Sequence, residues 1–60
     1  MNLKELLEKF ENGSHHFLIY DSNGLILYHT IWYNLISKKD MNREVVNYQI
    51  EQYHIRAEIE

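Results

Sequence analysis

Histidines are the residues whose chemistry stands out first, because imidazole is a good ligand for Zn²⁺. His15 and His16 are adjacent, so on a strand they would point to opposite faces and could not both reach one ion. His16 and His29 flank a predicted hairpin and could lie opposite each other, but no acidic residue close in sequence supplies a third ligand. No two histidines have the i, i+4 spacing of a helical metal site. The sequence therefore predicts no metal site and no cofactor.

The three serines do not indicate nucleophilic catalysis. Ser14, Ser22 and Ser37 each fall in a predicted turn or helix end, where local hydrogen bonds to the backbone account for them. The two glycines, Gly13 and Gly24, form no phosphate-binding loop. Acid–base catalysis needs a group held in a desolvated pocket, which a chain of 60 residues can hardly enclose. We predict that the chain is not an enzyme.

Length and composition indicate one small domain over residues 1–60. Hydrophobic residues make up 45% of the chain, too many for a disordered segment. The net charge of −3 argues against a binder of duplex nucleic acid, which needs a basic face. There is no cysteine, so no disulfide can staple the marginal core of so short a chain. No apolar run approaches the roughly 18 residues of a membrane span, so we expect a soluble, cytoplasmic protein.

The clearest element is an amphipathic helix at about residues 2–12. Leu3, Leu6, Leu7 and Phe10 have the i, i+3, i+4, i+7 spacing of one helix face. Asn2 can cap this helix in a capping box with the glutamate three residues later, and the glycine at position 13 would end it.

A β-hairpin is predicted next. The apolar runs at residues 16–20 and 25–29 flank an Asn23-Gly24 turn, in which Gly24 can take the positive φ that the turn requires. Two registers remain open, one that places Tyr20 opposite Leu27 and one that places it opposite Leu25. Both strands are apolar on both faces, so one helix can cover only half of this surface.

Residues 30–42 favour a short helix, which Thr30 would cap and a polar loop at 37–40 would end. The alternative is that the second strand continues to Tyr33. Further along, residues 46–50 alternate apolar and polar side chains, and residues 53–59 do so more strictly, as expected for a second hairpin with a turn at Glu51-Gln52. A helix over 42–53 is the alternative there.

The order α-β-β-(short α)-β-β predicts a small α+β domain. Its expected form is an antiparallel sheet of about four strands, with the first helix packed on one face.

Aromatic side chains are the main indication of function. Tyrosine and tryptophan are enriched where one side of the ring is buried and the other is wet, as at protein interfaces. The chain has too many of them for so small a core, so we predict a protein-binding surface. The candidate partner-binding residues are Tyr20, Tyr28, Trp32, Tyr33, Tyr48 and Tyr53.

A nucleic-acid-associated regulator is the alternative. Lys38, Lys39 and Arg43 form the one basic cluster, and Trp32 and Tyr33 lie nearby in sequence as stacking groups. The polar face of the last strand, His54, Arg56, Glu58 and Glu60, does not resemble an RNA-binding sheet, which interleaves aromatic and basic residues.

The chain resembles small accessory proteins of bacteriophages and mobile elements. The likeness lies in the short first helix, the hairpin of residues 19–28, Asn-Arg-Glu-Val-Val at 42–46 and Ile-Arg-Ala-Glu-Ile-Glu at 55–60. It implies a phage-encoded binder that inhibits a host defence system. With the small size, the acidic balance and the excess of tyrosine and tryptophan, the leading hypothesis is a non-enzymatic protein-binding module that acts on a host protein by occlusion or locking. Such inhibitors are often tiny, acidic and dimeric.

A homodimer is also expected from the residues themselves. An uncovered apolar face on the first hairpin would leave a patch that soluble monomers rarely tolerate. The last strand could offer its free edge to a second copy across a two-fold axis.

Overall fold

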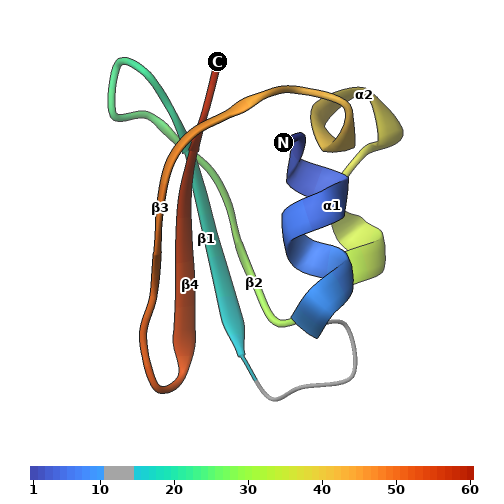
Figure 1. The fold of residues 1–60 in the computed structure, drawn as a ribbon, viewed down its shortest axis with the longest axis vertical. Helices are drawn as coiled ribbons and strands as arrows, with labels where there is room; N and C mark the ends of the chain where they lie inside the picture. Colours follow the sequence, from blue (N-terminus) through green and yellow to red (C-terminus); the bar gives the residue numbers. More distant parts are fainter. Residues whose placement is uncertain (11–14) are drawn as a thin grey trace.

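The computed structural model describes residues 1–10 and 15–60. It is a small α+β domain with short helical segments and a four-stranded mixed sheet (Figure 1). The elements, with η marking a 3₁₀ turn, are α1 (Leu3–Leu7), η1 (Glu8–Phe10), β1 (His16–Asp21), β2 (Ile26–Thr30), η2 (Tyr33–Leu35), α2 (Lys38–Met41), β3 (Val45–Ile50) and β4 (His54–Ile59).

The sheet has the strand order β2-β1-β4-β3. Each hairpin is antiparallel, but the two hairpins meet through a parallel pairing of β1 with β4. The prediction of a wholly antiparallel sheet is therefore wrong at its centre. The reason lies in residues 31–44, which return the chain to the end where β2 began. β3 then runs in the same direction as β2, and β4 in the same direction as β1.

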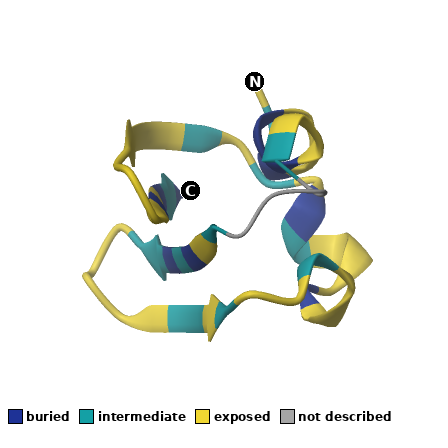
Figure 2. Cartoon of the chain, turned by 90° about the horizontal axis from the view of Figure 1, so that it is seen from below, coloured by how far each residue is buried: buried dark blue, intermediate teal, exposed yellow. Residues whose placement is uncertain are grey.

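All the helical segments lie on one face of the sheet, and the other face carries no element of the described chain (Figure 2). Burial is concentrated in the two central strands, where buried residues alternate with exposed or half-buried ones. Phe17 and Ile19 of β1 and Ile55, Ala57 and Ile59 of β4 point to the covered face.

The amphipathic helix is confirmed at its start. Asn2 accepts a hydrogen bond from the Glu5 amide at 2.9 Å, and Glu5 accepts one from the Asn2 amide at 3.0 Å, so the capping box is complete. Leu3, Leu6 and Leu7 pack into the core, and the chain tightens into η1 after Leu7. The predicted end at residue 12 and the stop at Gly13 lie outside the described residues.

The first hairpin is confirmed, with a different register. Gly24 has φ +83°, as its place in the turn requires. Tyr20 pairs with Ile26, because Leu27 is an extra residue in a bulge between this pair and the Ile19–Tyr28 pair. Neither predicted partner of Tyr20 is therefore correct. The Asp21 carboxylate fixes the turn by accepting the amides of residues 23 and 25, both at 2.9 Å.

Between the hairpins, the chain forms two short turns of helix instead of one. Thr30 ends β2 and does not cap a helix, although its Oγ1 accepts the Trp32 amide at 2.9 Å. The predicted extension of the strand to Tyr33 is wrong, since η2 begins there. The predicted polar loop at 37–40 is also wrong: Ser37 caps α2 by accepting the Asp40 amide at 3.2 Å. The Ser37 cap and the buried side chain of Met41 stabilise a helical turn here, although most of its residues are polar.

The second hairpin is confirmed, and the alternative helix over 42–53 is wrong. The turn lies one residue later than predicted, because the amide of Glu51 donates to the carbonyl of His54 at 2.8 Å and leaves Gln52 and Tyr53 as the loop. β4 is an interior strand. The predicted free edge at the chain end is therefore wrong, since β1 and β3 occupy both of its sides.

Candidate functional site

The edge strand β3 is the candidate site that the fold makes most accessible. Its six residues, Val-Val-Asn-Tyr-Gln-Ile, include no charged residue, proline or glycine, and five of the six are exposed. Soluble proteins commonly guard such edges with charges or proline, because unpaired backbone groups invite another strand. At the start of β3, the Val45 amide donates to the Met1 carbonyl at 2.9 Å. No strand of the described residues pairs with the rest of the outer side of β3. This edge can accept a strand.

The side chains of β3 add apolar surface to the free edge. Tyr48 and Ile50 pair with Ala57 and Ile55, which are buried on the helix-covered face. Yet Tyr48 is 45% exposed and Ile50 is 51% exposed. Val46, at the bulge of the strand, is 57% exposed. The three side chains form an apolar margin beside the free backbone edge.

A second exposed apolar group lies at the opposite side of the sheet, around β2. It consists of Leu25, Ile26, Ile31, Trp32 and Leu35. Trp32, the one tryptophan of the sequence, lies between β2 and η2 and is 61% exposed. The uncovered apolar surface expected from the first hairpin is therefore present, but it spreads over the edge and the following turn rather than over one flat face.

The six aromatic residues predicted to bind a partner do not form one surface. Tyr48 and the exposed Tyr53 lie on the β3 side, and Trp32 lies on the β2 side. Tyr20 is half-buried on the open face, beside Glu58 of β4. The remaining two, Tyr28 and Tyr33, lie on the helical side of the molecule.

Tyr28 has a structural role. Its hydroxyl donates to Asp40 Oδ2 at 2.5 Å and accepts from the Ser37 amide at 3.3 Å, so it joins β2 to α2. The Arg43 Nη1 donates to Asp40 Oδ1 at 3.0 Å, and its Nε donates to the Glu60 carbonyl at 2.6 Å. The hydrogen bond from Tyr28 is the largest cause that holds the pKa of Asp40 below its ordinary value of 3.8, against the opposing effect of burial. This network links β2 and the last residue, Glu60, to α2.

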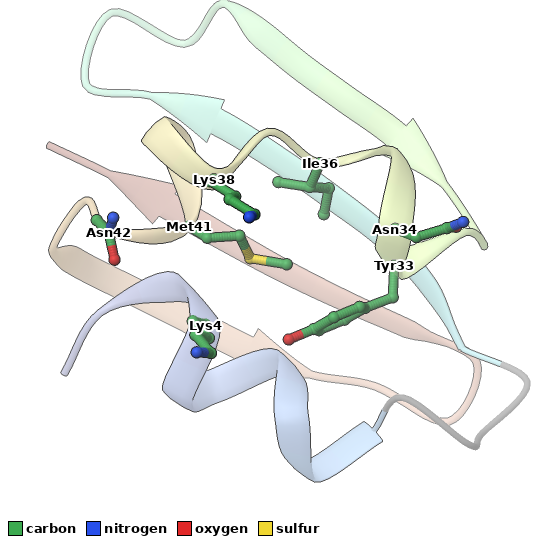
Figure 3. Close-up of a pocket in the computed structure, with 7 residues that line it drawn as sticks. All are labelled: Lys4, Tyr33, Asn34, Ile36, Lys38, Met41 and Asn42. Atoms are coloured by element: carbon green, nitrogen blue, oxygen red, sulfur yellow. The ribbon is translucent and has the colours of Figure 1, made fainter.

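Tyr33 lines a half-open pocket of about 500 Å³ between α1 and the η2–α2 segment (Figure 3). The other lining residues are Lys4, Asn34, Ile36, Lys38, Met41 and Asn42. Ile36 and Met41 are buried and form the apolar floor, and the Met41 side chain extends toward the Tyr33 ring. With two lysines and two carboxamides, the pocket can hold a small anion or an acidic side chain.

The basic cluster of the nucleic-acid alternative is smaller than the sequence suggests. Arg43 is engaged with Asp40 and with the Glu60 carbonyl, so its guanidinium serves the fold. Lys38 and Lys39 remain exposed, and Lys38 borders the pocket. Two lysines on a chain of net charge −3 make a small basic face.

Three histidines share the open face of the sheet. His16 and His54 are direct partners in the parallel pair, with ring centroids 5.3 Å apart. The ring centroid of His29 is 6.3 Å from that of His16, but His29 pairs with Leu18 across the hairpin. The expected direct opposition of His16 and His29 is therefore wrong. His15 packs edge-on against Phe10 instead. In the part of the chain that the structure describes, no three ligand side chains are already arranged to hold a metal ion.

Comparisons with protein-family models, curated proteins and solved structures find no match to this chain. Of the helices that the structure describes, none is long and apolar enough to cross a membrane.

The β3 edge and the His16–His54 pair are the features that sequence reasoning missed. The signal for the first was a six-residue run without charge, which indicates an interface only once the strand is known to lie at an edge. The signal for the second was that both histidines stand one residue before a buried strand position.

Proposed function

We propose that this chain is a non-enzymatic protein-binding module that pairs β3 with a strand of a partner protein. One observation carries the proposal: β3 is an edge strand without a charged residue, bordered by the exposed side chains of Val46, Tyr48 and Ile50. Strand addition draws affinity from main-chain hydrogen bonds and specificity from alternate side chains. Both components are available along this edge.

The partner in this proposal is a host protein of the cytoplasm. The resemblance to small accessory proteins of phages supports a defence protein as the first class to screen. A chain of this size would act by covering an edge or an active surface of a larger protein, which is inhibition by occlusion or locking. The partner strand should be apolar on the side that faces Tyr48 and Ile50.

We also propose a homodimer, now through a different surface from the end of β4. The exposed group around β2, including Ile26 and Trp32, lies on the side of the sheet opposite to β3. Burying it against a second copy would add apolar contact to a small core and leave β3 free for the partner.

The test is an affinity pull-down from host lysate, read by mass spectrometry, with two matched lysine variants. Tyr48→Lys places a charge on the β3 edge, and Leu35→Lys places the same charge on an exposed residue of η2, on the other side of the sheet. We expect the wild type and Leu35→Lys to recover the same partner in stoichiometric amount, and Tyr48→Lys to lose it. Recovery of no stoichiometric partner, or equal recovery by Tyr48→Lys, would refute the proposal.

A further inference from the structure

We propose that the open face of the sheet binds a divalent transition-metal ion, with His16 and His54 as its two protein ligands. The site lies on the face that the helices do not cover and is independent of the β3 edge. Both imidazoles are exposed, so an ion can reach them from solvent.

The strand register carries the first part of the argument. β1 and β4 are adjacent and parallel, and His16 and His54 occupy one register position. Each precedes a buried residue, Phe17 or Ile55, so each points to the open face. The two histidines therefore stand side by side on the two central strands, which are the most constrained elements of this fold.

The separation of the rings carries the second part. Zinc binds imidazole nitrogen at about 2.0–2.1 Å, so two rings on one tetrahedral ion have centroids about 5.2 Å apart. The centroids of His16 and His54 are 5.3 Å apart, with the ring planes inclined by 38°. Small side-chain rotations can thus direct one nitrogen of each ring at a common ion without movement of the backbone.

A carboxylate lies on one side of the two histidines, and a third imidazole lies on the other. Glu51 and His54 close the second hairpin as an opposed pair, so the Glu51 carboxylate lies on the same face as His54. His29 flanks His16 on β2, at 6.3 Å between ring centroids. The negative charge of Glu51 offsets the positive charge of Arg56, which is the next residue of β4 that points to the open face. Neutral imidazole selects zinc, copper or nickel over magnesium or calcium.

Zinc titration of the purified chain, in a buffer that does not bind zinc, tests the site. Calorimetry would give the affinity, and the imidazole resonances in NMR spectra would report which histidines respond. We expect saturable binding at one ion per chain, with the signals of His16 and His54 shifting together. His16→Gln leaves His54 without its paired imidazole. His54→Gln leaves His16 beside His29 alone, at 6.3 Å between ring centroids, which is wider than the spacing of about 5.2 Å for two rings on one tetrahedral ion. Each substitution should therefore weaken binding by about tenfold or more.

His15→Gln is the matched control, because His15 adjoins His16 in sequence but packs against Phe10. It should bind zinc within about twofold of the wild type. Thermal melting of each variant would establish that it is folded. The proposal is overturned if the wild type shows no saturable binding, or if His16→Gln and His54→Gln bind zinc as His15→Gln does.

Discussion

Replacing Tyr28 with phenylalanine removes one hydroxyl from the link between β2 and α2. That hydroxyl donates to the Asp40 carboxylate at 2.5 Å and is the largest cause of the lowered pKa of Asp40. A hydrogen bond to a charged group contributes about 1.5–3 kcal/mol to stability. The Asp40 side chain is 19% exposed and keeps its bonds from Ser37 and Arg43, so we expect a loss of about 1–2 kcal/mol.

The pH dependence of this loss follows from the direction of the pKa shift. The folded pKa of Asp40 lies below 3.8, so its contribution to stability is fully present above pH 3.8. The contribution is lost as the pH falls through the folded value, where the carboxylate becomes protonated. The difference in unfolding free energy between wild type and Tyr28→Phe should therefore be largest at neutral pH and shrink on acidification below 3.8.

Urea unfolding at several pH values, followed by circular dichroism, measures this difference. Tyr20→Phe is the matched control, because Tyr20 is half-buried on the open face and its hydroxyl makes no hydrogen bond in the described structure. We expect Tyr20→Phe to change stability by less than about 0.5 kcal/mol. Equal stability of Tyr28→Phe and wild type at neutral pH, or a difference that grows on acidification, would contradict the assigned role of the network.

Three further changes test the turn, the core and the second apolar surface. Gly24→Val should destabilise the protein by about 1–2 kcal/mol in thermal or urea unfolding, because φ is +83° at this residue. A steric clash is not the cause, since a Cβ would meet no atom within 4 Å. Gly24→Asn should destabilise less, and equal melting temperatures of Gly24→Val and the wild type would mean that the turn does not require a positive φ. Ile55→Ala should cost about 2–5 kcal/mol, since Ile55 is fully buried at the centre of the sheet. Trp32→Ser should convert the proposed dimer to a monomer in light scattering. A wild-type mass of 7.4 kDa at every concentration would exclude the dimer.

Local signals in the sequence determined the elements that depend on neighbouring residues. The capping box of Asn2 and Glu5, the leucine stripe of α1 and the positive φ of Gly24 each involve side chains and backbone within a few residues. The alternation over residues 53–59 likewise determined which side of β4 is buried, because side chains on a strand alternate between faces. These features need no knowledge of the rest of the chain.

Strand order was decided only by the tertiary structure. Which strand lies beside which depends on the path of residues 31–44, where two short turns of helix dock through Ile36 and Met41 on the core. Local polarity predicted a loop at Ser37–Asp40, but the Ser37 cap and the bond from Tyr28 to Asp40, 12 residues apart in the chain, make it helical.

Both proposed sites depend on that strand order. The composition of β3 acquires meaning only at an edge, since the same uncharged residues would be unremarkable in a central strand. His16 and His54 are 38 residues apart in the sequence and become neighbours only because β1 and β4 pair in parallel at one register. Contacts between distant segments arise from the packing of the whole chain, and no local pattern of residues encodes them.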